Sequence, residues 1–255
     1  MKLAAQLFTL REYTKTPQDI KETLKKVKEM GYNAVQVSAI GQIEPQLLKE
    51  YADDAGVEIC VTHTAFDRIV NDTENVILEH KLWNCKYIGL GSMDEKYRND
   101  KQGYDEFLKT LSPAVDKIYD SGLKFLYHNH AFEFARIDGK TTGIEYLAQK
   151  TDPKKFGFLA DFYWVQAGGA SPIEFIGKYP DRLNIVHFKD MTIIENKATM
   201  AEIYEGNMDY DSIYAECEKI GVEWVAIEQD RCRINPFDSL KLSYDNLAKR
   251  GMFRN

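Results

Sequence analysis

Eight short apolar stretches, rich in β-branched and aromatic residues, recur along the chain, and a segment with helical periodicity follows each of them. The stretches are residues 2–10, 33–38, 58–64, 86–92, 124–130, 156–164, 184–190 and 224–230. Most are almost continuously apolar, as parallel strands covered on both faces are, and none is joined to the next by a two-residue hairpin turn. The alternation therefore predicts an α/β fold built on a parallel sheet.

The intervening segments carry the signals that start and stop helices. In TPQDIKETLKKVKEMG, Thr16 can cap a helix and Pro17 suits its first turn. Segments of the same kind cover residues 45–56, 105–122, 210–221 and 236–251. Each of the five predicted helices ends at a glycine suited to a left-handed conformation: Gly31, Gly56, Gly122, Gly221 and Gly251.

Eight strand-to-helix units that fill 255 residues predict a closed (β/α)8 barrel, with residues 1–255 as one domain. An open dinucleotide-binding sheet is disfavoured because no GxGxxG follows the first strand. Residues 192–208 form the longest connection that we expect to be irregular. A barrel places such a connection on the face where loops carry function.

Composition narrows the possible partners. The chain is 44% hydrophobic and 29% charged, which is ordinary for a folded globular protein. Its net charge of −7, without a local Lys/Arg stripe, argues against a nucleic acid partner. Charge appears at Arg11 before a signal-type apolar stretch is complete, and no 18 apolar residues run together, so we expect a cytoplasmic protein without a membrane partner. The four cysteines form no CxxC pair and are expected to be reduced packing residues.

Ligand-type side chains gather at the predicted strand ends, which surround one site in such a barrel. Four of the five histidines belong to this group, whereas His80 lies away from the predicted strand ends, on a helix or loop. The group consists of Gln6, His63, His128, His130, Glu133, Asp161, His187, Lys189, Asp190, Glu228 and Asp230.

Converging carboxylates and imidazoles are costly to bury unless they are paired or share a cation. We therefore expect a divalent metal, Mn²⁺, Zn²⁺, Mg²⁺ or Co²⁺, because the ligand types do not choose among these ions. Glu133 lies beyond the strand tip, so His128 or His130 could take its place as a ligand. The favoured ligands are Glu133, Asp161, His187 and Glu228.

Structural roles compete with this interpretation at single positions. A lone histidine at a strand end, such as His63, is more often a hydrogen-bonded structural residue. Asp161 could cap a helix, and Lys189 with Asp190 could form a solvated ion pair worth at most about 1 kcal/mol. Glu228 is harder to explain structurally, because an acid that ends a buried strand needs a cation or strong donors.

Four motifs, YHNHAFEF, ADFYWVQAGG, VHFKD and IEQD, occur in that order at the predicted ends of the last four strands. With them the chain resembles the sugar phosphate isomerase/epimerase superfamily of xylose isomerase-like TIM barrels, which includes inosose dehydratases, ketose 3-epimerases and 3-keto-glycoside lyases. The opening AAQLFTLRE and the stretch EGNMDYDSIYAECEKIG resemble it as well. The similarity therefore runs from end to end.

The resemblance implies a divalent metal that Glu, Asp, His and Glu from the last four strands hold against adjacent oxygens of a sugar or polyol. Asp161, His187 and Glu228 match that pattern directly. A departure occurs at Trp164, where many relatives have histidine, and its indole suits a pyranose face.

A second departure lies in the fifth strand. Many epimerases have a glutamate at its tip, whereas this chain reads His128-Asn129-His130 and delays the acid to Glu133. This departure leaves the fourth ligand open. It also argues against a plain epimerase in which one glutamate removes the proton and another returns it.

Proton abstraction next to a metal-bound carbonyl, through an enediolate, is the chemistry that such a site favours. His130 is the first choice of base, since imidazole titrates near neutral pH, and Lys189 could polarise the carbonyl or hold an anionic group. The catalytic candidates are His130, Glu133, Lys189 and Glu228. The substrate-binding candidates are Gln6, His63, His128, Trp164 and Lys189.

We therefore expect a divalent-metal-dependent isomerase or epimerase of a sugar, sugar phosphate or polyol. A dehydratase or 3-keto-glycoside lyase is the alternative, because the same enediolate can expel a β-substituent. A non-catalytic sugar-binding barrel and an endonuclease-type phosphodiesterase are less favoured. The expected cofactor is one divalent ion, Mn²⁺ first, with no nucleotide, and the expected partners are a small sugar or polyol and, by analogy, a second copy of the chain.

Overall fold

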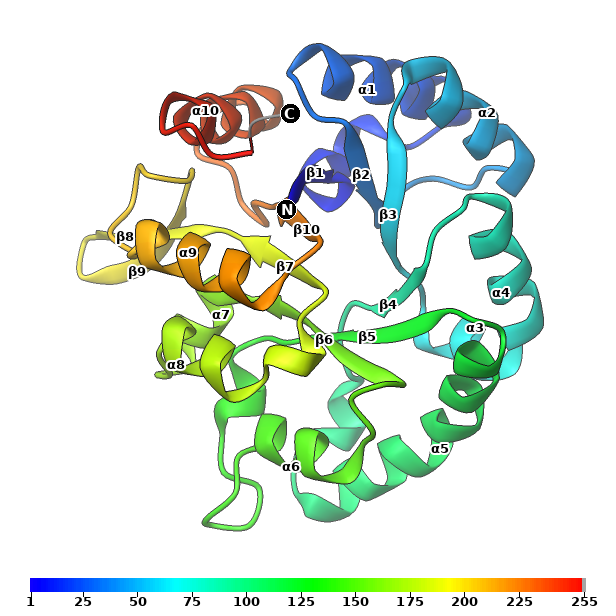
Figure 1. The fold of residues 1–255 in the computed structure, drawn as a ribbon, viewed down its shortest axis with the longest axis vertical. Coiled ribbons are helices and arrows are strands. Elements are labelled where there is room, and N and C mark those ends of the chain that lie inside the picture. The colour runs from blue at the N-terminus through cyan, green and yellow to red at the C-terminus, as the bar shows by residue number, and fades with distance from the viewer. Residues whose placement is uncertain (254–255) are drawn as a thin grey trace. The chain divides into compact units, whose positions relative to one another are not determined.

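Eight parallel strands close into a barrel in the computed structural model, which describes residues 1–253 (Figure 1). Their order around the barrel is β1-β10-β7-β6-β5-β4-β3-β2, which confirms the predicted (β/α)8 fold. The strands are β1 (Lys2–Gln6), β2 (Ala34–Val37), β3 (Glu58–His63), β4 (Tyr87–Leu90), β5 (Lys124–His128), β6 (Phe156–Asp161), β7 (Ile185–Phe188) and β10 (Trp224–Ile227).

Helices follow the strands as the punctuation predicted. The capping box at Thr16 and Asp19 starts the first of them, and all five predicted terminal glycines have positive φ. The helices are α1 (Pro17–Glu29), α2 (Pro45–Ala55), α3 (Phe66–Asn71), α4 (Thr73–Leu82), α5 (Lys101–Asp120), α6 (Gly143–Lys150), α7 (Phe162–Ala167), α8 (Pro172–Lys178), α9 (Tyr210–Ile220) and α10 (Pro236–Lys249). Short 3-10 helices are η1 (Leu7–Tyr13), η2 (Glu95–Tyr97), η3 (Phe132–Phe134) and η4 (Pro180–Arg182).

In two of the predicted strands, residues 2–10 and 156–164, the last residues are helical because a side chain at the strand end caps a helix. The Gln6 side-chain oxygen accepts a hydrogen bond from Phe8 N, so residues 7–13 form η1 instead of extending β1. The Asp161 carboxylate accepts one from Trp164 N, so residues 162–167 form α7. Capping of this kind satisfies backbone donors that a longer strand would have paired with its neighbour.

The chain comprises two compact units. The first unit is residues 1–62 together with the segment from Ile185 onward, and the second is residues 63–184. In the first, α1 and α2 lie side by side outside β2 (Figure 1). In the second, α5 packs on β5, and Phe107, Tyr127 and Phe156 form part of a buried aromatic core.

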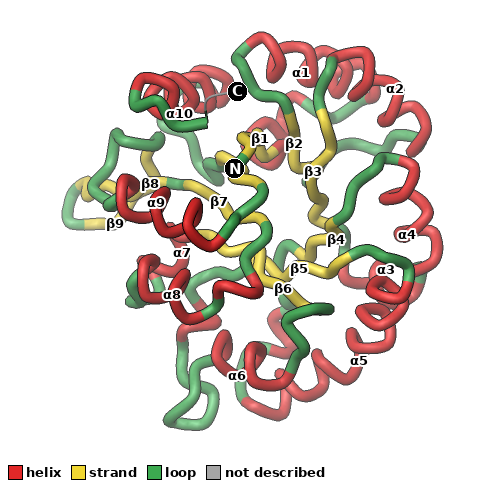
Figure 2. Tube along the Cα trace, viewed as in Figure 1, coloured by secondary structure: helices red, strands yellow, loops and turns green. Residues whose placement is uncertain are grey.

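The connection at residues 192–208 contains a β-hairpin, which corrects the expectation that it is irregular. Strand β8 (Asp190–Ile194) pairs antiparallel with β9 (Lys197–Ala201), as a separate two-stranded sheet beyond β7 (Figure 2). Glu195 and Asn196 both have positive φ, which is the conformation of a type I′ hairpin turn. The β-branched run Thr192-Ile193-Ile194, followed directly by Glu195 and Asn196, was the available signal for this hairpin.

The remaining expectations concern the membrane and the cysteines. Among residues 1–253, no helix combines the length and the apolar character needed to cross a membrane. All four cysteines are free, and Cys60, Cys85 and Cys217 are buried, as expected of reduced packing residues.

Gly31 offers a test of the helix ends. It has a φ of 111°, and a Cβ there would collide with the ring of Tyr244, whereas Gly122 has a φ of 85° and open space around it. We expect Gly122→Ala to lower the free energy of unfolding by about 1 kcal/mol through backbone strain alone. Gly31→Ala should lower it by about 2–4 kcal/mol, because overpacking adds to that strain. Urea unfolding of the two variants measures the difference, and equal losses would contradict the contact with Tyr244.

Candidate functional site

The first unit holds a buried group of polar side chains that we call the His187 cluster: Gln36, His187, Lys189, Glu228 and Asp230. His187 lies in β7, and Glu228 follows β10 directly. The His187 ring is fully buried, with Nδ1 at 3.0 Å from Glu228 Oε2 and Nε2 at 2.6 Å from Gln36 Oε1. Both ring nitrogens therefore face oxygen atoms.

The Gln36 contact favours one tautomer of a neutral His187 ring. An amide oxygen only accepts hydrogen bonds, so this contact favours the proton on Nε2. Nδ1 then presents its lone pair to the Glu228 carboxylate, which is also an acceptor. Two acceptors at 3.0 Å repel each other unless a proton or a cation lies between them.

Lys189 supplies the positive charge of the His187 cluster. Its side chain is fully buried, its Nζ lies 2.9 Å from Glu228 Oε2, and it also forms an ion pair with Asp230. Lys189 thus pairs with two carboxylates rather than with Asp190, which corrects the idea of a solvated Lys189–Asp190 pair. Asp190 instead accepts hydrogen bonds from four backbone amides between residues 191 and 208. Two carboxylates and one ammonium give the cluster a net charge of −1.

The second unit holds a matching group, the His128 cluster: His63, His128, Asn129, His130, Asp161 and Trp164. His128 Nδ1 lies 3.0 Å from the carbonyl oxygen of Gly91, and Nε2 lies 3.7 Å from Asp161 Oδ2. The carbonyl makes Nδ1 the protonated nitrogen of a neutral ring. Nε2 therefore presents a lone pair to a fully buried carboxylate, as Nδ1 of His187 does in the first unit.

Asn129 holds Asp161 in place by its backbone. The Asn129 side-chain oxygen accepts from Asp161 N at 3.0 Å, and its amide donates to the Asp161 carbonyl at 3.4 Å. Oδ1 of Asp161 caps α7 at Trp164 N, at 3.1 Å, so the alternative of a capping role is confirmed. Oδ2 is the oxygen that faces His128. Capping and ligand roles are therefore compatible in one carboxylate.

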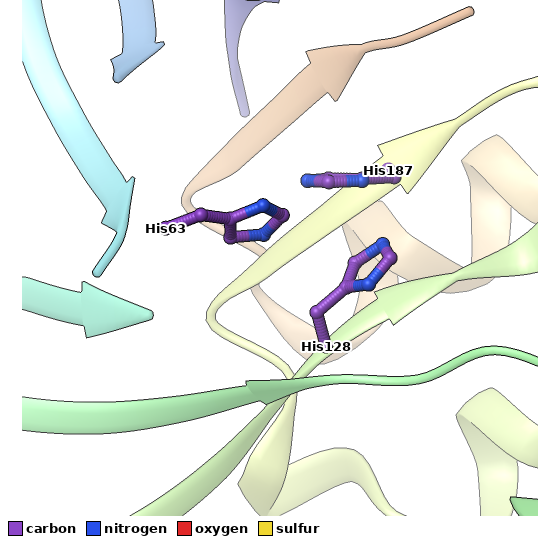
Figure 3. A group of neighbouring side chains, drawn as sticks. All are labelled: His63, His128 and His187. Carbon is purple, nitrogen blue, oxygen red and sulfur yellow. The ribbon is translucent and has the colours of Figure 1, made fainter. Parts of the chain in front are cut away.

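Imidazole and indole rings line the rest of the His128 cluster. Figure 3 shows His63 and His128 with their rings turned toward each other, at a centroid distance of 5.0 Å, and His187 on β7. His130 lies 4.8 Å from His128 and 5.5 Å from Trp164 between ring centroids. The predicted base and the predicted sugar platform are thus neighbours.

Glu133 serves the loop after β5. Its carboxylate is fully buried, accepts from the Tyr127 hydroxyl at 2.6 Å and accepts from His130 N at 2.8 Å. Burial raises the pKa of Glu133 to about 7, although the hydrogen bonds from Tyr127 and His130 oppose the rise. Its predicted roles as ligand and catalyst gain no support from these contacts, whereas His128, the alternative ligand, lies beside Asp161.

Two further polar residues end up buried on neighbouring strands. Gln6, a predicted substrate-binding residue, caps η1, and its register partner in β2 is Gln36. Sequence reasoning missed Gln36 and treated Asn129 only as part of a motif. A polar residue inside the buried strand AVQV was the available signal for Gln36.

Comparison with known proteins places the chain in a family. Residues 24–249 match the family model described as "Xylose isomerase-like TIM barrel". The chain belongs to the xylose isomerase-like TIM barrel family. An inosose dehydratase of Lacticaseibacillus casei, which has 23% identity over 246 residues, shares 82% coverage of each chain. The expected superfamily is therefore confirmed.

Solved structures show the same fold. A sugar phosphate isomerase/epimerase from Parabacteroides distasonis superposes with a TM-score of 0.81 at 23% identity, covering 97% of this chain and 98% of that one. A family protein from Mycobacterium smegmatis, solved in complex with magnesium, has a TM-score of 0.74 at 11% identity, covering 97% and 95%.

The raised pKa of Glu133 predicts a pH dependence of stability. A carboxyl whose pKa is about 7 in the folded chain and about 4.5 when unfolded favours the fold fully below pH 4.5, and this contribution is lost as pH rises through 7. In the native chain this lowers the free energy of unfolding by up to about 3 kcal/mol between pH 5 and pH 8. We expect that decrease to be absent in Glu133→Gln.

Urea unfolding at several pH values measures this effect. Glu145→Gln is the control, because the Lys178 ammonium lowers the pKa of Glu145 to about 2 and its effect falls below pH 4.5. Identical slopes for the native chain and Glu133→Gln between pH 5 and pH 8 would contradict the raised pKa.

Proposed function

We propose that this chain is a divalent-metal-dependent carbohydrate enzyme that removes a proton next to the carbonyl of a keto-sugar or cyclic keto-polyol. The observation that carries the proposal occurs once in each unit. In each cluster, one nitrogen of an imidazole ring contacts an oxygen acceptor that favours a proton on it, and the other nitrogen faces a carboxylate oxygen with its lone pair. A cation between the second nitrogen and the carboxylate removes the repulsion, since both groups can donate lone pairs to it.

Charge and ligand type support a divalent ion. We propose that both clusters contribute ligands, His187 and Glu228 from the first unit and His128 and Asp161 from the second. Lys189 and the three carboxylates of Asp161, Glu228 and Asp230 carry a net charge of −2, which a divalent ion neutralises. Two imidazoles and two carboxylates suit Mn²⁺, Zn²⁺ or Co²⁺. We propose these four residues as the ligands, with His128 in the place first assigned to Glu133.

The strand order is compatible with this proposal. Strands β5, β6, β7 and β10 are consecutive in the barrel, and each has one proposed ligand within one residue of its carboxyl end. In barrels of this kind the carboxyl ends of the strands surround the active site. When bound, the ion would act as a Lewis acid that stabilises negative charge on a substrate oxygen.

The proposed proton chemistry belongs to His130 and Lys189. His130 lies at the tip of β5 beside Trp164, so a sugar stacked on the indole brings its C–H bonds to an imidazole base. Lys189 is the buried ammonium that can donate to a substrate oxygen. Gln6 and His63 are proposed to hold substrate hydroxyls.

Dehydration is the outcome that we favour. A two-base epimerase needs a second free carboxylate, but Glu133 is held by Tyr127 and His130 N, and Glu228 is paired with Lys189. Loss of a β-hydroxyl needs one base and one acid, which His130 and Lys189 supply. The relative named inosose dehydratase supports this choice, while the structure named sugar phosphate isomerase/epimerase supports the alternative.

Metal removal tests the proposal. We expect chelation to abolish solvent deuterium exchange into a bound keto-polyol such as an inosose, and Mn²⁺ or Co²⁺ to restore it. Asp161→Asn and Glu228→Gln should each weaken Mn²⁺ binding more than about 100-fold, because each removes a ligand charge. Exposed Asp209→Asn, at the start of α9, is the control. Exchange that survives complete removal of metal would contradict the proposal.

His130 separates catalysis from metal binding. We expect His130→Gln to lower the rate of C–H exchange by about 10²–10⁴-fold, because it removes the base, while the affinity for Mn²⁺ stays within a few-fold of the native chain. NMR in D₂O measures the exchange, and calorimetry measures the affinity. A new enone absorbance indicates dehydration, and exchange with retained hydroxyls indicates epimerisation. Native exchange rates in His130→Gln would contradict its role as the base.

A further inference from the structure

We infer that Gln36 is a positioning residue that holds the proton of His187 on Nε2 and so presents Nδ1 to the divalent ion. The inference rests on the proposed metal site. It assigns a role to a strand residue that lies outside the proposed ligand set and makes no proposed contact with substrate.

The contact joins strands that are not neighbours. Gln36 lies in β2 and His187 in β7, with β1 and β10 between them in the barrel order. In the register row of His187, those two strands carry alanines, Ala226 in β10 and Ala4 in β1. These small side chains leave the long Gln36 amide room to reach Nε2, at 2.6 Å.

Gln36 is chemically suited to this role. A neutral imidazole has two tautomers, and the hydrogen bond at one nitrogen decides which nitrogen is left to bind a metal. Without the acceptor at Nε2, the proton can move to Nδ1 and donate to Glu228, which closes the metal-binding position. An uncharged amide fixes the tautomer without adding a third carboxylate to a cluster that already carries two.

The buried amide of Gln36 destabilises the fold, which also indicates a function for this residue. Its side chain is fully buried, and its Nε2 has no hydrogen-bond partner within residues 1–253. A buried donor without an acceptor destabilises the fold, so stability alone would favour an apolar residue here. The amide oxygen, through its bond to His187, gives a reason for this residue.

Two variants and one control test the inference in the full chain. Gln36→Met keeps the length of the side chain and removes the acceptor, whereas Gln36→Glu keeps an acceptor. Thr23→Val is the control, because Thr23 is a buried polar residue of the same unit whose hydroxyl donates to the Tyr13 carbonyl and does not contact His187. Nitrogen-15 NMR of the metal-free chains reports the His187 tautomer, and calorimetry with Mn²⁺ alone reports affinity.

We expect native His187 to be protonated at Nε2, and Gln36→Met to shift the proton toward Nδ1 and weaken Mn²⁺ binding about 10–100-fold. Gln36→Glu and Thr23→Val should keep both the tautomer and an affinity within about threefold of native. Native His187 protonated at Nδ1, or native Mn²⁺ affinity in Gln36→Met, would overturn the inference.

The design distinguishes this failure from failure of the metal site. If the native chain binds no Mn²⁺, the proposed function fails, whatever Gln36 does. If Gln36→Met does not fold, the native tautomer and the Gln36→Glu affinity decide the question, and a tenfold loss in Gln36→Glu counts against the inference.

Discussion

An imidazole nitrogen without a proton repels a carboxylate oxygen, and this constraint dominates the polar interior of the chain. Nδ1 of His187 lies 3.0 Å from a Glu228 oxygen, and Nε2 of His128 lies 3.7 Å from an Asp161 oxygen. In each ring the other nitrogen contacts an oxygen acceptor, so a change of tautomer in the neutral ring would only move the repulsion to that contact. In the function that we propose, a divalent cation takes the place of the missing proton in each pair.

Helix caps and other hydrogen bonds from side chains to the backbone position these groups, in addition to strand pairing. Asp161 ends β6, caps α7 with one oxygen and turns the other toward His128. Asn129, directly after β5, accepts a hydrogen bond from the Asp161 backbone amide. Glu133 anchors the next turn beneath His130. The rigidity of the proposed site therefore comes from side chains that never need to touch substrate, which is how preorganised sites are commonly supported.

Sequence alone predicted the barrel and the strand-end residues because both follow local patterns: apolar runs, helix punctuation and the residue that comes after a run. It extended β1 into η1 and β6 into α7, since the caps at Gln6 and Asp161 depend on geometry that periodicity does not encode. It missed Gln36 as a partner of His187 because 151 residues separate them and only the closed barrel brings them together.

Anomalous scattering from crystals soaked in Mn²⁺ is the most direct measurement of the central claim. The proposed site predicts one strong peak at bonding distance, about 2.0–2.3 Å, from Nδ1 of His187 and from a Glu228 oxygen, with His128 and Asp161 as the remaining ligands. A peak beside Nε2 of His187, or no peak near His187 and Glu228 at saturating Mn²⁺, would contradict it.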